Sequence, residues 1–390
     1  MNRRIEQLDS IRGLAALAVV LSHIPYMALS LPFIVYKLLI ILRINNGHSS
    51  VMLFFVLSGF VLALPFLKEQ ENNYLPYIIK RFFRIYVPYI FAITLAIILS
   101  QIFLKENIVS LGDWDMLWSI PVSLKLIFEH IFFIGNIHSN SFNGPIWSLI
   151  HELRISLVFP FIVFLIKRVN WKITIIISLV LSCISGLNNI FNFQESNGYN
   201  ITYFHTIHFV SLFILGALLA KHKNEVITVY KKLHRIYKWL LLFTSLFIYQ
   251  FSEFIVYFLH GFTNIDFIST HFWIIVEYGV ALGSVGLIVS ALGSYRLERI
   301  LLFRPILFLG KISYSLYLYH LPIILGCFYL LHYILPLWLI SIIGIFLSVC
   351  IASVAWKLVE QPSINIGKLL AKKLKGILAI YWIRGAKRSA

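Results

Sequence analysis

The sequence predicts an all-α polytopic integral membrane protein with about ten transmembrane helices. Its 390 residues are 59% hydrophobic and only 13% charged, with a mean hydropathy of +0.85, whereas soluble domains carry about 25% charged residues. Several apolar runs approach the ~20 residues that a helix needs to cross a bilayer. The basic residues lie mainly between alternate runs, as the loops of membrane proteins require.

Ten apolar runs are the predicted membrane spans. The first lacks the short apolar core and small-residue cleavage site of a signal peptide, so we expect it to stay in the membrane. Cys183, Cys327 and Cys350 have no metal-ligand spacing, so neither a zinc site nor a disulfide framework is indicated. The predicted spans are 11–29, 50–67, 85–104, 145–166, 173–190, 204–220, 239–259, 270–292, 306–331 and 337–356.

The net charge of +17 follows the predicted topology. With the N-terminus inside, 28 of the 33 Lys and Arg residues fall in inner segments or at the inner ends of spans. Only Lys37, Arg43, Lys105 and Lys125 lie outside, and Arg154 lies within a span. This bias predicts an even number of spans with both termini cytoplasmic. The positive charge therefore indicates membrane orientation and not a nucleic-acid partner.

The chain divides into a transmembrane domain, residues 1–362, and a basic cytoplasmic tail, residues 363–390. We expect the tail to lie on the anionic inner leaflet. The longest outer segment, about 105–143, contains the stretch LKLIFEHIFFIG. This stretch is too short to span and predicts an interfacial or re-entrant helix.

Arg12 and His23 lie in the first apolar run, LDSIRGLAALAVVLSH. Their spacing places both on one helix face, roughly 16 Å apart along the axis, with His23 near the middle of the bilayer. Ionisable residues at this depth are costly and indicate a functional site. A neutral imidazole suits a general base for a hydroxyl nucleophile, and Pro25 is expected to loosen the backbone beside it. The alternative is a snorkelling Arg and a His used in packing.

A second polar stretch, NGPIWSLIHELRISLVFPF, begins the fourth span. Glu152 is predicted ~10 Å from the outer edge and shares a helix face with Ser148. The alternative is a buried Glu satisfied by a neighbouring helix.

A third stretch, FLGKISYSLYLYHLPI, places Ser313, Tyr317 and His320 on one helix face, with His320 near the level of His23. The alternative there is an interfacial aromatic belt.

A fourth stretch, KRFFRIYVPY, brings Lys80, Arg81 and Arg84 into the third span from the cytoplasm. Guanidinium groups suit bidentate phosphate contacts. By itself this pattern is equally typical of residues that only orient the helix.

Together these stretches resemble the acyltransferase family 3 integral membrane proteins, which include O-acetyltransferases of bacterial surface glycans. The resemblance runs in family order from residue 8 to about 362 and covers nearly all of the chain. The motifs that carry it are LDSIRGLAALAVVLSH, FFVLSGFVL, KRFFRIYVPY, NGPIWSLIHELRISLVFP, GKISYSLYLYHLPI and VEQP.

The resemblance implies roles for particular residues. Arg12 and His23 match the family's essential pair, with His23 as the catalytic base, and Glu152 would orient the imidazole or the acceptor. Arg81 and Arg84 match a basic pair expected to bind acyl-CoA. The residues expected to contact substrate are Trp147, Ser148, Ser313, Tyr317 and His320, and Tyr314 also matches the family pattern.

Two departures from the family pattern bear on acceptor fit. Arg154-Ile155-Ser156 stands where the family usually has an aromatic pair, and Tyr319 stands where it often has Trp.

We therefore expect a multi-pass O-acyltransferase of the bacterial inner (plasma) membrane, in particular an O-acetyltransferase. Its co-substrate would be acetyl-CoA or another acyl-CoA, with no permanently bound cofactor. Its acceptor would be a hydroxyl of a lipid-linked or surface polysaccharide such as O-antigen, capsule or exopolysaccharide. Direct transfer and a relay through an acyl-histidine both stay open.

Two alternatives also stay open. A transporter without covalent chemistry would show polar residues at the midplane as well. An enzyme acting on a small molecule, such as a macrolide or a peptidoglycan-type amino sugar, would share the same motifs.

Overall fold

The structure is a computed structural model that describes residues 5–24, 43, 46–69, 73–103, 118 and 121–388, with side chains up to Ile377. Within these residues the chain is helical and has no strand, which confirms the all-α prediction. Pro25, Lys37 and Lys105, and with them much of the predicted outer segments, lie outside the described residues.

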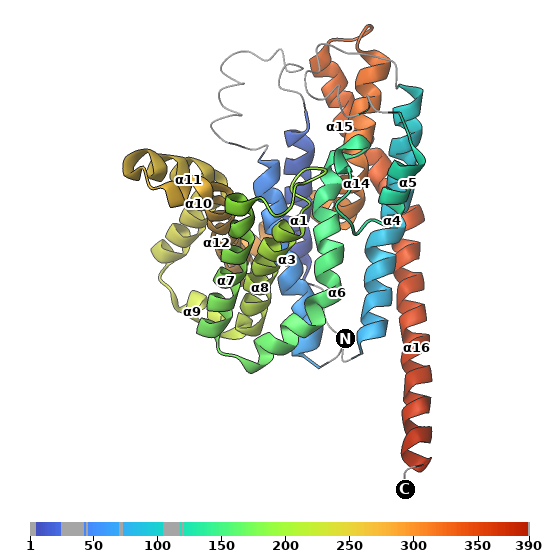
Figure 1. Cartoon of the computed structure of the whole chain (residues 1–390). Helices are drawn as coiled ribbons and strands as arrows, with labels where there is room; N and C mark the ends of the chain where they lie inside the picture. The colour runs from blue at the N-terminus through green and yellow to red at the C-terminus, as the bar shows by residue number, and fades with distance from the viewer. Residues whose placement is uncertain are drawn as a thin grey trace.

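The long helices up to α15 alternate in direction through one bundle, and α16 continues in the direction of α15 (Figure 1). Two short 3₁₀ turns, η3 (Ser139–Ser141) and η4 (Gly144–Ile146), precede α6, and a π-helical turn, η5 (Trp356–Glu360), joins the last two helices. The α-helices are α1 (Glu6–Ser22), α3 (Gly47–Leu67), α4 (Tyr74–Ile102), α5 (Leu124–Ile131), α6 (Trp147–Arg168), α7 (Trp171–Phe191), α8 (Tyr203–Lys221), α9 (Lys223–Lys232), α10 (Arg235–Thr263), α11 (Asp266–Thr270), α12 (Phe272–Gly293), α13 (Tyr295–Leu301), α14 (Arg304–Leu331), α15 (Leu337–Ala355) and α16 (Gln361–Arg388).

Nine helical segments of the described chain are long and apolar enough to cross a membrane. They correspond to the predicted spans after the first. α1 has 17 residues and ends at Ser22, two residues before the described chain stops, so it falls short of the predicted span 11–29. The start of α1 and the end of α16 lie on the same side of the bundle (Figure 1).

One predicted boundary is corrected by the structure. α4 begins at Tyr74 and not at residue 85. Lys80, Arg81 and Arg84 were expected to precede the span. They line a cavity between helices, and this lets the helix include them. Residues 363–388, in the segment predicted as the cytoplasmic tail, belong to α16, which follows the last span and packs on α4, where Ser363 donates a hydrogen bond to the carbonyl of Phe83.

Glycines allow the central helices to approach closely. A Cβ added at Gly13 of α1 would overlap with the backbone of Gly310 in α14. At Gly59 of α3 it would overlap with the carbonyl of Phe213 in α8, and Gly216 faces α3 in the same way. Such small-residue contacts are typical of helix packing in membranes, where backbones can come together without side chains between them.

α5 lies against the side of α4 and not at the end of the bundle. The carbonyl groups of Ile131 and His130 accept hydrogen bonds from Tyr86 and Tyr89, which lie near the middle of α4. The ring of Phe133 stacks on that of Tyr89 with their centroids 3.6 Å apart. Irregular backbone at this level is tolerated where it is buried in protein or lines a cavity. Of the two possibilities left by the sequence, these contacts favour the re-entrant helix, and we call residues 124–146 the re-entrant segment.

Candidate active site

A pair of histidines from α1 and α14 lies at the centre of the bundle. His23 ends α1, and its ring centroid lies 4.9 Å from that of His320. His23 Nδ1 lies 2.7 Å from the carbonyl oxygen of Val19, and His320 Nδ1 lies 2.8 Å from that of Tyr317. A carbonyl oxygen can only accept, so both Nδ1 atoms carry the proton. His320 Nε2, 3.4 Å from His23 Nδ1, then accepts, and in this tautomer the basic nitrogen of His23 is Nε2.

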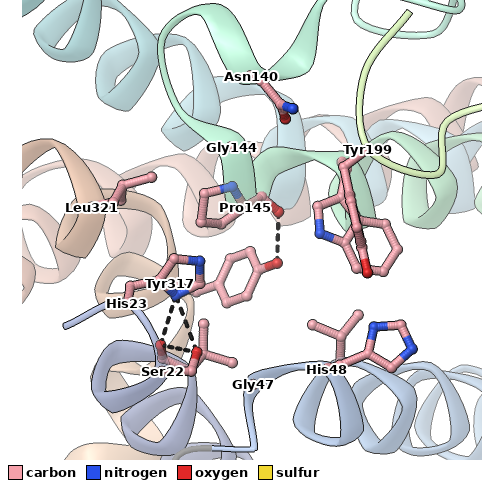
Figure 2. A pocket seen from close by; sticks show the side chains of 13 residues that line it. Ser22, His23, Gly47, His48, Asn140, Gly144, Pro145, Tyr199, Tyr317 and Leu321 are labelled. Carbon is pink, nitrogen blue, oxygen red and sulfur yellow. Dashed lines mark hydrogen bonds between the residues drawn. The ribbon is translucent and has the colours of Figure 1, made fainter. Parts of the chain in front are cut away.

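His23 lines a cavity of about 510 Å³, which we call the chamber. Figure 2 shows His23 and His48 on opposite sides of the chamber, with Tyr317 between them in this view. η4 and the loop before α8 contribute Pro145 and Tyr199, so the re-entrant segment forms part of its wall. The neutral polar and aromatic side chains that line it are Ser22, His23, His48, Asn140, Trp147, Tyr199 and Tyr317.

A narrower cavity of about 60 Å³, the neck, adjoins the chamber. Tyr317 lines both, and its hydroxyl lies 2.7 Å from Ser148 Oγ and donates to the carbonyl of Pro145 at 2.6 Å. Tyr317 therefore stands between the two spaces. The other polar residues lining the neck are Arg12, Arg84, Ser148, Glu152, Ser313 and Tyr314.

The neck leads to a third cavity of about 490 Å³, the vestibule, with which it shares Arg12 and Arg84. Burial and then the neighbouring charge of Lys68 lower the pKa of Lys223 at this cavity. Asp9 is the one acidic residue among the described lining residues. So many cations around one cavity indicate a site for a polyanion. The cationic residues lining the vestibule are Arg12, Lys68, Lys80, Arg81, Arg84, Lys223 and Lys368.

The two arginines of KRFFR differ in what they contact. Arg81 Nη2 lies 2.6 Å from Glu152 Oε1, and its Nε donates to Ser156 Oγ at 3.1 Å. Arg84 has no hydrogen bond or ion pair within the described part of the chain, so its guanidinium is open to a ligand.

The position of Glu152 corrects two expectations. It was predicted ~10 Å from the outer edge, but its partner Arg81 lies seven residues from the start of α4, toward the opposite end. The depth was misjudged because the segment before α6 folds back into the bundle. Within the described part of the chain Glu152 makes no hydrogen bond to the His23 ring, whose Nδ1 faces Val19, Ser22 and His320.

The two departures from the family pattern line none of the three cavities. Arg154 donates to the carbonyl groups of Ile134 and Ile201 and to Thr206 Oγ1, at 2.7, 2.9 and 2.8 Å. It thereby joins the re-entrant segment to the start of α8. Tyr319 is buried among apolar side chains.

Sequence analysis missed one polar group at the chamber. Glu277 of α12 lies 2.9 Å from His48 Nε2 and 2.8 Å from His208 Nε2. A carboxylate inside a predicted span, 270–292, was the available signal, because intramembrane ionisable residues mark functional sites.

Comparison with known proteins identifies the family of the chain. A family model described as an acyltransferase domain matches residues 5–357. O-acetyltransferase OatA from Staphylococcus aureus strains NCTC 8325 / PS 47 and COL is 24% identical over 379 residues, which cover 92% of this chain and 57% of the relative. The chain thus spans less than two thirds of the length of these relatives. No solved structure shows a significant match. Because the family model spans nearly the whole chain, this multi-pass membrane protein belongs to that acyltransferase family.

Proposed function

We propose that the chain is an O-acetyltransferase of the plasma membrane that moves an acetyl group from acetyl-CoA to a hydroxyl of a lipid-linked or surface glycan. The observation that carries this proposal is the row of three adjoining cavities, which begins with the cationic vestibule and ends with the chamber at His23. The relatives named O-acetyltransferase support the acyl group and the oxygen acceptor.

The donor would bind with its phosphates in the vestibule. Arg84 is open to a phosphate, whereas Arg81 is held by Glu152, so we assign the main phosphate contact to Arg84. Arg12 lines both vestibule and neck and would stay near the donor. The pantetheine arm is a thin, uncharged chain, which suits the narrow neck. Its thioester would then pass Tyr317 and reach the chamber beside His23.

His23 Nε2 would act as general base. It takes the proton of the acceptor hydroxyl while the oxygen attacks the thioester carbonyl. The C–S bond then breaks, and the CoA sulfur leaves with the proton that His23 returns. The carbonyl of Val19 and His320 Nε2 both face His23 Nδ1, so they stabilise the imidazolium that forms. A positioned general base contributes roughly 10²–10⁴-fold to such a rate.

The test is acetyl transfer by the purified chain in nanodiscs, with radiolabelled acetyl-CoA and surface polysaccharide as acceptor. His23→Ala should lower the rate by at least about 100-fold. His332→Ala is the matched control, since His332 Nδ1 also faces a helix carbonyl, at 3.1 Å, but lines none of the three cavities. Undiminished transfer by His23→Ala would exclude His23 from the chemistry. If the unmodified chain transfers no acetyl group from acetyl-CoA, the proposed function is wrong.

A further inference from the structure

A second imidazole lines the chamber opposite His23 and is held by a buried carboxylate. His48 lies at the start of α3, and its Nε2 is 2.9 Å from Oε1 of Glu277 in α12. The side chain of Glu277 is only 5% exposed, whereas that of His48 is 21% exposed and lines the chamber. The carboxylate does not line the chamber. The imidazole of His48 does, and it is the group that a ligand would meet (Figure 2).

The carboxylate is fixed from both sides. Its second oxygen, Oε2, lies 2.8 Å from Nε2 of His208, a residue of α8 that is almost fully buried. His208 Nδ1 lies 2.8 Å from Ser182 Oγ in α7. Four helices therefore hold this row of side chains. Each carboxylate oxygen of Glu277 faces one histidine, so the carboxylate keeps its position beside His48.

This arrangement fixes the chemistry of the imidazole. Nε2 must carry a proton to bind the carboxylate, so Nδ1 of neutral His48 has a lone pair and accepts hydrogen bonds. Within the described part of the chain Nδ1 has no hydrogen-bond donor. A ligand hydroxyl is the group that would satisfy it.

The surroundings of His48 are aromatic. The ring of Trp147 is nearly parallel to that of His48, with 17° between the planes and 6.2 Å between the centroids. Tyr199 lies edge-on to Trp147 at 5.3 Å. Aromatic faces carry partial negative charge and attract the C–H edges of a sugar ring. Flat apolar walls combined with a few fixed polar groups are typical of a site that orients a small polar ring.

We propose that His48, Trp147 and Tyr199 form the acceptor subsite, which binds one pyranose ring of a glycan. His48 Nδ1 accepts a hydrogen bond from one hydroxyl of that ring and thereby turns another hydroxyl toward His23. His48 is a positioning residue in this scheme, and Glu277 and His208 keep its orientation. The proposal rests on the proposed function and adds to it the chemical class of the acceptor group.

The experiment measures sugar binding and acetyl transfer separately. Saturation-transfer NMR with the chain in nanodiscs detects binding of methyl pyranosides (glucoside, galactoside, rhamnoside and N-acetylglucosaminide). Transfer to the same compounds yields the KM values for acceptor and donor, and mass spectrometry with NMR identifies the acetylated hydroxyl. The variants are His48→Gln and Glu277→Gln. The matched control is His138→Gln, which breaks a His–Glu contact of 2.8 Å that lines none of the three cavities.

We expect His48→Gln to weaken pyranoside binding and raise the acceptor KM about tenfold, equivalent to about 1.4 kcal/mol. The donor KM should stay unchanged, and acetylation should spread to more than one hydroxyl. Glu277→Gln should act in the same direction, because the imidazole is no longer held in one tautomer. His138→Gln should match the unmodified chain.

Three outcomes would overturn the subsite: no pyranoside binds to the unmodified chain, the two variants keep its acceptor KM and product, or they lower only kcat. If the chain transfers no acetyl group but still binds a pyranoside, and His48→Gln weakens that binding, the proposed function is wrong and the subsite stands.

Discussion

The ion pair between Arg81 and Glu152 should couple α4 to α6. The pair is short, 2.6 Å, and the side chains are only 7% and 18% exposed. Glu152→Gln leaves Arg81 with Ser156 as its partner, in a cavity wall that already contains Arg12 and Arg84. Arg81→Met leaves an unpaired carboxylate in the neck.

Breaking a buried pair from one side typically costs 3–5 kcal/mol, because the remaining charge is uncompensated. The vestibule exposes one edge of this pair to water, so we take the lower end, about 3 kcal/mol, for each single change. The double variant Arg81→Met/Glu152→Gln leaves neither charge behind. Its loss should be smaller than the sum of the two singles by about 2 kcal/mol, the size expected for contacting charges.

Unfolding of the four proteins in mixed detergent micelles, followed by circular dichroism, gives this double-mutant cycle. On the folded fraction of Glu152→Gln we expect a raised KM for acetyl-CoA and little change in kcat, since Glu152 contacts Arg81 and not His23. If the single losses add within about 0.5 kcal/mol, the pair is not coupled. A fall in kcat without loss of stability would restore a catalytic role for Glu152.

Three further predictions follow from the cavities and the helix packing. Arg84→Gln should raise the KM for acetyl-CoA about tenfold, most strongly at low salt, whereas Arg168→Gln at the end of α6 should not. Burial and nearby positive charge lower the pKa of Lys223. A bound phosphate raises it again, so affinity for acetyl-CoA should fall as pH rises through the lowered pKa, and Lys223→Arg should flatten this fall in a binding titration. Gly59→Ala should destabilise the folded protein by about 1–3 kcal/mol, because α3 and α8 must separate. Gly261→Ala, where the added Cβ meets open space, should instead stabilise it by about 0.5–1 kcal/mol. The denaturation midpoints of the two variants test this difference.

The order and type of the helices could be predicted because apolar length is a local property of the sequence. The proximity of His23 and His320 could be predicted for a similar reason. Counting helical turns from the ends of their two spans places both residues at a similar depth. The same count failed for Glu152, because η4 and the start of α6 sit inside the bundle. Helix-turn counting assumes that a span starts at the membrane surface, and a re-entrant segment removes that reference.

Pairing between helices was beyond the sequence for a different reason. Arg81 and Arg84 are three residues apart and read alike, and only the position of α6 decides that Arg81 meets Glu152. His48 and Glu277 are separated by 229 positions, so no local pattern joins them. Glu277 alone could have been found from its place in an apolar run, but its partner could not.

The distribution of charge along the three cavities separates the two substrates. The vestibule is crowded with cations, the neck retains two of them, and no Lys, Arg, Asp or Glu is among the described residues that line the chamber. A donor phosphate is stabilised in the vestibule and would lose that stabilisation by moving further, so the phosphates stay while the uncharged arm advances. The carboxylate of Glu277 lies behind His48 and does not face the chamber. An uncharged ring would therefore meet hydrogen-bonding side chains and aromatic faces there. In the proposed function, the same gradient holds the phosphates of acetyl-CoA at one end and leaves the other end to a neutral hydroxyl compound, so the two substrates would meet beside His23.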